Sequence, residues 1–330
     1  MTYSAYSTRV NYASNLGLIH GLETMVCMAT DGAHAVVGGN WQIFASMLKD
    51  TSNANVRLNT TVTSMKLSSY GSYVVEYAPT DSSEEVSSTW TATEKFDTVV
   101  LAGPYQFANI SMDPLPLHVP DKIPYVELHV TLFASPHMLS PEAFNLAPGS
   151  SVPVVVLTTL QPDENHGSDP NGVGSPGFFS ISTLGIAANE GTGKMEFLYK
   201  IFSPAPVSNE FLGKYWGLDA PESGDISKDD ISWIYRKIWH SYPYEYPRVT
   251  FDELRLDENL WYTSPIESFI STMETSALSG KNIAKLIVDD WNERGVAGDN
   301  AFINVTPADA AGIELPVVGD QHPLDGFIQA

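Results

Sequence analysis

The sequence is poor in the residues that build disulfides and metal sites. It contains a single cysteine, Cys27, among 330 residues, and its eight histidines are scattered without an H-E-x-x-H motif or an i, i+4 pair. One thiol excludes an internal disulfide, and its apolar neighbours favour a buried structural role. We therefore expect neither a disulfide framework nor a metal site.

Basic residues are also scarce. Seventeen Lys and Arg stand against 39 Asp and Glu, which gives a formal charge of -22. Such a chain repels phosphate backbones, so nucleic acid is not an expected partner. No apolar run reaches the roughly 18 residues of a membrane span, and residues 1–11 lack the apolar core of a signal peptide. The 43% apolar composition is that of an ordinary globular protein with one large core or two coupled ones.

Several familiar catalytic strings are absent or misplaced. There is no G-x-S-x-G nucleophile elbow, and residues 191–194 lack the spacing of a P-loop. Residues 172–177 match G-x-G-x-x-G as a string, but they follow a polar loop, contain Pro176 and precede an extended run. A dinucleotide fingerprint needs a strand before it and a helix after it, so we reject this match.

The first third of the chain predicts strands around one helix. A Gly-Gly turn, Gly38-Gly39, precedes a helical pattern with apolar residues 43, 44, 47 and 48. Residues 55–67 and 73–77 are expected to pair as strands, and 90–93 to add another. Residues 95–104 form the clearest buried strand and end in Ala-Gly-Pro. Nucleotides bind at such carboxyl ends in doubly wound folds.

The middle of the chain has a different texture. Alternating apolar patterns over 125–133, 152–158, 178–184 and 196–202 predict an inserted antiparallel sheet, which residues 231–239 close as a helix or a strand. The run from Trp239 to Pro247 then holds five aromatic or imidazole side chains and two prolines. Such a stiff aromatic run walls an apolar channel, or alternatively forms an interdomain hinge packed on the core.

A helix is predicted after residue 270. Ser271 and Glu274 match an S-x-x-E capping box, and the stripe of residues 273, 277, 280, 284 and 287 is mostly small. Small residues on a buried helix face allow another group to approach the backbone closely. That group is either a packed strand or a cofactor ring resting on the N-H groups of the positive helix end.

These segments resemble the prenylcysteine oxidase (prenylcysteine lyase) family. The S/T-M-E helix start preceded by an acidic residue is similar to that family's C-terminal flavin-binding motif, and residues 9–12, 19–22, 37–48 and 239–247 are similar to further segments. The resemblance implies FAD as the cofactor. It implies that backbone N-H groups of Thr272 and Met273 face the pyrimidine end of the flavin, and that Glu267 lies near the ribityl or pyrophosphate region. The resemblance adds further cofactor-binding residues: Ser271, Glu274, Gly39 and, through its backbone at the adenine, Val62.

The same resemblance implies the activity. Members of this family oxidise S-prenylcysteine (farnesyl or geranylgeranyl) to a prenyl aldehyde, cysteine and hydrogen peroxide in the degradation of prenylated proteins. The expected partners are a prenylated thioether and dioxygen, the catalytic residues are unknown, and the substrate-binding residues would be Trp239, His240, Tyr242 and Tyr244. The family implies a vacuolar, lysosomal or secretory glycoprotein, and three N-x-[ST] sequons, at residues 59, 109 and 304, fit that location.

The resemblance covers only about the family's C-terminal two-thirds, because the G-x-G-x-x-G unit that binds the ADP portion is not in the sequence. The expected class is α/β (mixed α+β): a Rossmann-like FAD domain without its N-terminal βαβ unit, with an inserted antiparallel substrate domain. The domains would be a helical segment 1–36, a partial FAD domain 37–104 with 255–295, a substrate domain 105–254 and a tail 296–330. The alternatives are an incomplete chain, a shortened natural form or a non-catalytic homologue that binds ligands, and a different amine-oxidase-like flavoenzyme.

Overall fold

The computed structural model describes residues 21, 25–26, 34–51, 54–80, 90–158 and 173–295. The chain divides into two compact units, 1–283 and 284–330. Several predictions lie outside the described residues: the similar segments at 9–12 and 19–22 apart from residue 21, the thiol of Cys27, most of the helical segment 1–36, the sequon at 304 and the tail 296–330.

The Gly-Gly turn and the helix after it are confirmed. Gly38 and Gly39 have φ of 86° and 113°, values that L side chains rarely adopt, and α3 (Trp41–Asp50) begins directly after Asn40. No residue of α3 is buried within the described part of the chain. The apolar side of this helix, which includes Phe44 and Met47, is exposed.

A four-stranded sheet follows in the order β3-β2-β1-β5. The predicted pairing across residues 68–72 is confirmed, because β1 runs antiparallel to β2 and β2 antiparallel to β3. Strand β5 instead runs parallel to β1. The strands are β1 (Thr60–Leu67), β2 (Tyr73–Pro79), β3 (Ala92–Phe96) and β5 (Ser111–Asp113).

The single buried strand predicted over 95–104 is wrong. The segment bends at residues 97–98, so that its first part ends β3 and its second part forms β4 (Val99–Leu101), of which only Leu101 is buried. Strand β4 pairs in parallel with β12 (Leu260–Tyr262), which pairs antiparallel with β11 (Arg255–Asp257). An apolar run alone does not reveal such a bend, because both halves keep strand-forming residues.

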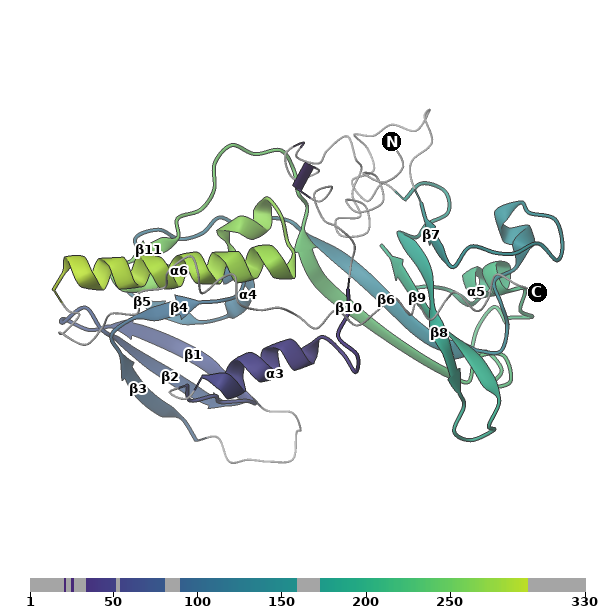
Figure 1. Ribbon diagram of the computed structural model, residues 1–330, viewed down its shortest axis with the longest axis horizontal. Helices are drawn as coiled ribbons and strands as arrows, with labels where there is room; N and C mark the ends of the chain where they lie inside the picture. Colours follow the sequence, from purple (N-terminus) through teal and green to yellow (C-terminus); the bar gives the residue numbers. More distant parts are fainter. Residues whose placement is uncertain are drawn as a thin grey trace. The chain divides into compact units, whose positions relative to one another are not determined.

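The predicted antiparallel sheet of the middle segment is confirmed. Its order is β10-β6-β9-β8-β7, with every neighbouring pair antiparallel. Figure 1 shows the long strands β6 and β10 running side by side along one edge of this sheet. Residues 231–239 therefore belong to a strand. The strands are β6 (Tyr125–Ser135), β7 (Val155–Leu157), β8 (Ser180–Ala188), β9 (Met195–Ser203) and β10 (Trp233–Pro243).

One face of the five-stranded sheet carries the largest core. Phe133, Tyr199 and Ile201 from the sheet pack with Leu212 and Tyr215 of α5 (Asn209–Trp216). Helix α5 begins at an N-cap, Ser208, whose side chain accepts a hydrogen bond from the backbone N-H of Phe211. The short 3-10 helix η2 (Pro141–Phe144) lies beside α5.

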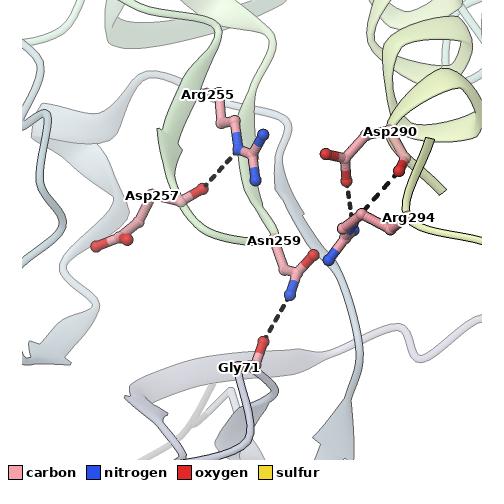
Figure 2. Close-up of polar contacts among 6 residues, drawn as sticks. All are labelled: Gly71, Arg255, Asp257, Asn259, Asp290 and Arg294. Carbon is pink, nitrogen blue, oxygen red and sulfur yellow. Dashed lines mark hydrogen bonds and ion pairs between the residues drawn. The ribbon is translucent and has the colours of Figure 1, made fainter.

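A second core joins the two smaller sheets. Met65 and Val75 of the four-stranded sheet pack with Leu101, Leu256 and Leu260 of the three-stranded sheet. Leu256 and Leu260 are almost completely buried, and each such side chain contributes about 2 kcal/mol of burial free energy. Figure 2 shows an additional polar link, in which the Nδ2 amide of Asn259 donates to the carbonyl oxygen of Gly71 at 2.7 Å.

The predicted helix after residue 270 is α6 (Met273–Glu293), but its cap is shifted by one residue. Thr272 Oγ1 accepts from the N-H of Thr275, and the N-H of Thr272 donates to Thr275 Oγ1. The capping box is therefore Thr272/Thr275, and the predicted Ser271/Glu274 box is wrong. Both boxes overlap in the same five residues, so a T-x-x-T pair competes with the S-x-x-E pair.

The predicted stripe of α6 is exposed at Met273, Ala277 and Ala284, whereas Gly280 is half-buried and Ile287 is buried. A Cβ added at Gly280 would meet no heavy atom within 4 Å among the described residues. The buried side instead holds Ser279, whose hydroxyl donates to the carbonyl oxygen of Thr263 at 2.7 Å, and Ile283. No packed strand approaches the small residues described in the first unit.

The described part of the second unit is the end of α6 with its last turn. Two ion pairs at i, i+4 spacing, Lys285 with Asp289 and Arg294 with Asp290, stabilise this end. Figure 2 includes the second of these pairs.

The class is mixed α/β with mostly antiparallel sheets. Parallel pairing within the described residues is confined to β1 with β5 and β4 with β12. The Rossmann-like domain, its missing βαβ unit and the domain boundaries given above remain predictions.

Candidate functional site

A cleft of about 670 Å³ lies between the four-stranded sheet and the segment that contains β4 and α4 (Tyr105–Ala108). Its lining is mainly apolar and includes Val62, which the resemblance assigns to the adenine, and Gly103, at the carboxyl end of β4. A Cβ added at Gly103 would meet no heavy atom within 4 Å among the described residues. The backbone is therefore accessible at the strand end where nucleotide binding was expected.

One end of the cleft is polar. Arg57 forms a 2.6 Å ion pair with Glu94, and its guanidinium lies 4.5 Å from the ring centroid of Tyr77. The hydrogen bond that the Arg57 guanidinium donates to Glu94 raises the pKa of Arg57 further above its usual range. All three side chains line the cleft, so a ligand there meets charge at one end and apolar side chains along the rest.

Phe107 connects the cleft to the five-stranded sheet. Its ring lines the cleft and also forms an edge-to-face contact with Tyr125, with ring centroids 4.9 Å apart at 80°. The imidazole of His240 also contacts this ring, with ring centroids 5.2 Å apart. Strands β6 and β10 position Tyr125 and His240, because both residues lie at the same end of that paired edge.

Tyr125 in turn contacts Glu267. The Tyr125 hydroxyl donates to Glu267 Oε2 at 2.8 Å, and Glu267 lies in the 3-10 helix η3 (Ser264–Ser268) just before α6. Desolvation raises the pKa of Tyr125 well above its usual value, and the hydrogen bond to Glu267 and the nearby carboxylate of Glu245 raise it further. The hydroxyl therefore stays protonated at physiological pH and acts as a donor to Glu267.

Tyr262 fixes the start of α4. Its hydroxyl accepts a hydrogen bond of 3.1 Å from the backbone N-H of Tyr105, which is the first residue of α4. Burial raises the pKa of Tyr262, so its hydroxyl stays neutral. Because Tyr105 precedes Phe107 by two residues, this contact helps position Phe107 between the cleft and the sheet.

The start of α6 offers free backbone donors among the described residues. The N-H of Thr272 is already used in the helix cap, whereas the N-H of Met273 has no acceptor among the described residues. The first N-H groups of a helix have no partner within the helix and attract electron-rich groups. Of the two donors that the resemblance assigns to a flavin, Met273 is thus the one that is available.

The other predicted cofactor residues are separated. Val62 lines the cleft, but Gly39 belongs to the turn before α3, where a Cβ would meet the ring of Trp41 at 2.7 Å. Ser271 is half-buried and Glu274 is exposed beside the α6 cap.

The predicted substrate residues fall into two groups. Trp239 and His240 are exposed on β10, whereas Tyr242 and Tyr244 pack against an apolar cluster that contains Val126. Desolvation raises the pKa of Tyr242. His240 is the member of this set that the structure brings next to Phe107, and therefore close to Tyr125 and Glu267.

The residues of this site that were not selected from the sequence include Arg57, Tyr77 and Glu94 at the polar end and the aromatic residues Phe107, Tyr125 and Tyr262. Phe107 follows the Ala-Gly-Pro strand end by three residues, and Tyr125 begins the alternating run that became β6. Both positions are visible in the sequence, but nothing local distinguishes these aromatic residues from other core residues.

The described residues contain no group of three or more His, Cys, Asp or Glu side chains that could hold a metal ion. No described helix combines the length and the apolar character that crossing a bilayer requires.

Comparisons of the whole chain with a family model and with individual proteins agree on one family. Residues 4–300 match the family model for prenylcysteine lyase. The chain is 29% identical to a farnesylcysteine lyase of Arabidopsis thaliana over 284 residues, which are 85% of this chain and 47% of that protein. It is 36% identical to prenylcysteine oxidase 1 of Rattus norvegicus over 91 residues, 27% of this chain and 18% of the rat protein. The matched region is thus less than half of the plant relative.

Proposed function

Because this chain belongs to the prenylcysteine lyase family, we propose that the full-length protein is a flavin-dependent oxidase that cleaves the thioether of S-prenylcysteine. The names of its plant and rat relatives refer to farnesylcysteine and prenylcysteine. The chain spans 47% of the plant relative, so the activity of the whole protein is an inference from one part of it.

The proposed reaction is balanced by dioxygen and water. The bond between sulfur and the prenyl C1 carbon breaks, that carbon is oxidised by two electrons to the aldehyde, and dioxygen is reduced to hydrogen peroxide. Water supplies the aldehyde oxygen, and cysteine leaves as the free thiol. FAD, when bound, supplies the hydride acceptor and the reaction with oxygen.

The observation that supports this proposal is the junction at Phe107. This side chain lines the cleft that contains Val62 and Gly103, and it also contacts Tyr125 and His240 on the five-stranded sheet. A cofactor in the cleft would therefore meet a substrate at the end of that sheet. The open backbone at Gly103 and the available N-H of Met273 both fit an extended, electron-rich cofactor.

The chain's own residues would bind the cofactor and orient it. The N-H of Met273 would donate to an electron-rich edge of the flavin, and Glu267 would be held toward the cofactor by the hydroxyl of Tyr125. Phe107 would exclude water from the junction. The cleavage of the C–H bond requires no general base among these residues, because the thioether carbon loses a hydride and not a proton.

The test is the behaviour of the purified full-length protein. We expect absorbance at flavin wavelengths, retained or restored by added FAD, and peroxide release from farnesylcysteine but not from simple amines. Absence of flavin both with and without added FAD would instead identify a non-catalytic homologue. Peroxide release from amines and not from farnesylcysteine would identify another amine-oxidase-like flavoenzyme.

We also propose a vacuolar, lysosomal or secretory location. Two of the three sequon asparagines, Asn59 and Asn109, are exposed in the described structure and therefore accessible to glycosylation. Treatment of protein from its native source with an endoglycosidase should lower its apparent mass. An unchanged mass would contradict glycosylation at these sites.

A further inference from the structure

The polar end of the cleft is built on one face of the four-stranded sheet. Tyr77 of β2 lies directly opposite Val62 of β1, and Glu94 of β3 lies directly opposite Val75 of β2. Side chains opposite each other on paired strands share a face, and all four of these line the cleft. Arg57, which precedes β1, reaches the same face. Strand register therefore fixes the position of the ring and of the carboxylate at this end.

The guanidinium of Arg57 is held by both of these groups. Its Cζ lies 4.5 Å from the ring centroid of Tyr77, and its Nη2 lies 2.6 Å from Oε2 of Glu94. The same oxygen accepts a hydrogen bond from the Tyr77 hydroxyl at 3.4 Å. The side chains of Arg57 and Glu94 are nevertheless 37% and 41% exposed, so a ligand in the cleft can reach both.

Charge decides which kind of ligand group suits this end. Arg57 and Glu94 are the charged side chains in the described lining of the cleft, and they are paired with each other. Their charges largely cancel at a distance, and the chain as a whole has a formal charge of -22. A phosphate would therefore gain little here. A neutral, flat, polar ring would leave the ion pair intact and stack on the planar guanidinium.

The ion pair keeps hydrogen-bonding groups for such a ring. Oε1 of Glu94 has no donor among the described residues, because the contacts with Arg57 and Tyr77 both use Oε2. A guanidinium carries five N-H donors, so contacts with two side chains leave others for a ligand. A ring with an exocyclic amine beside a ring nitrogen offers the matching donor and acceptor, and adenine has this pattern. Hypoxanthine carries a carbonyl oxygen where adenine carries the amine.

We propose that Arg57, Tyr77 and Glu94 bind the adenine ring of the cofactor. The guanidinium, positioned by Tyr77 and Glu94, stacks on the ring, and the Glu94 carboxylate accepts a hydrogen bond from the exocyclic amine. The proposal rests on the proposed function in one respect, which is that FAD occupies the cleft. The resemblance implies only the backbone of Val62 at the adenine, and Val62 lies opposite Tyr77 at this same end.

The experiment compares ligands that differ in the base. Binding of ADP, IDP and FMN to the flavin-free full-length protein is measured by titration calorimetry, and competition with FAD by fluorescence. IDP carries hypoxanthine in place of adenine, and FMN lacks the adenosine half. We expect ADP to compete with FAD and to bind about tenfold more tightly than IDP, because the hypoxanthine oxygen cannot donate to Glu94.

Two substitutions separate hydrogen bonding from stacking. Glu94→Gln should bring the ADP-to-IDP ratio close to one, because a carboxamide both donates and accepts. Arg57→Met should raise the Kd of ADP and of IDP by about tenfold to a hundredfold, the range for loss of a stacking partner of one base. Arg57→Lys keeps the charge but not the planar group, so it should not restore this affinity. The Kd of FMN should stay unchanged in all three variants.

Matched controls come from the same sheet. Lys66→Met removes a cation that forms an exposed ion pair with Asp113, and Glu76→Gln changes a carboxylate that accepts from Ser64. Neither Lys66 nor Glu76 lines the cleft. Both variants should keep the Kd values and the ADP-to-IDP ratio of the wild type.

Three results would overturn the proposal: ADP that does not compete with FAD, a wild-type ratio in Glu94→Gln, or full affinity in Arg57→Lys, which would identify a phosphate contact. If protein loaded with FAD releases no peroxide from farnesylcysteine, the proposed function fails, but the ratio and its loss in Glu94→Gln still decide the adenine assignment. If turnover occurs and the ratio is the same in Glu94→Gln and in the wild type, only the adenine assignment fails.

Discussion

The hydroxyl of Tyr125 donates a 2.8 Å hydrogen bond to Glu267, joining the first residue of β6 to the 3-10 helix that precedes α6. The two residues are 142 positions apart in the sequence. This bond places a carboxylate from the cofactor motif beside the ring cluster of Phe107 and His240.

Tyr125→Phe should loosen Glu267 without altering the ring packing. The change removes only the hydroxyl, so the half-buried carboxylate loses a donor, at a cost of about 1–3 kcal/mol in unfolding free energy. If Glu267 contacts the cofactor, the Kd for FAD should rise by about tenfold. Fluorescence titration with FAD and urea unfolding measure the two effects.

The matched control for this variant is Tyr235→Phe. Tyr235 is exposed on β10, where its ring stacks on Trp233. Equal FAD affinity in the two variants would show that Tyr125 has only a structural role.

Met273→Pro should separate helix stability from cofactor binding. Met273 is the first residue of α6, where proline is well tolerated because the missing N-H has no partner within the helix. We expect thermal stability close to that of Met273→Ala, but weaker FAD binding and a shifted flavin reduction potential. The alanine variant keeps the N-H and serves as the control. Identical potentials in the two variants would argue against a flavin contact at this N-H.

A larger side chain at residue 103 should lower the affinity for a ligand in the cleft more than it lowers the stability of the fold. A Cβ at this position meets no described atom within 4 Å, so Gly103→Ala should change the unfolding free energy by less than about 0.5 kcal/mol. FAD affinity should fall from Gly to Ala to Val as the cleft narrows at the strand end. A series with constant affinity would show that the cofactor does not pass this residue.

Stability should fall at alkaline pH because of buried tyrosines. Burial raises the pKa of Tyr199 from 10.0 to about 12, and its hydroxyl donates to the carbonyl oxygen of His137 at 2.9 Å. The native state then holds a proton that the unfolded state has lost. Stability is therefore insensitive to this group below pH 10 and falls between pH 10 and 12, by up to about 1.4 kcal/mol per pH unit.

Tyr199→Phe should reduce that alkaline slope, even if it lowers stability at neutral pH. Urea midpoints at pH 8, 9, 10 and 10.5 measure the difference. A slope that matches the wild type would show that Tyr199 is not among the groups that titrate in this range.

Local patterns in the sequence were sufficient for most of the elements. The Gly38-Gly39 turn, the strands β1 and β2 and the antiparallel sheet follow from side-chain periodicity and from glycine's access to positive φ. Two errors arose where local signals compete. Overlapping capping boxes at the start of α6 differ by a single residue, and a continuous apolar run conceals the bend between β3 and β4.

The sequence by itself determined most of the segments that form strands and helices, and through its motifs the family to which the chain belongs. Only the tertiary structure decided which side chains meet. The contacts of Tyr125 with Glu267 and of Phe107 with His240 depend on strand register and on chain segments far apart in sequence. Periodicity reports the local conformation of the backbone, whereas these contacts arise from packing of the whole unit.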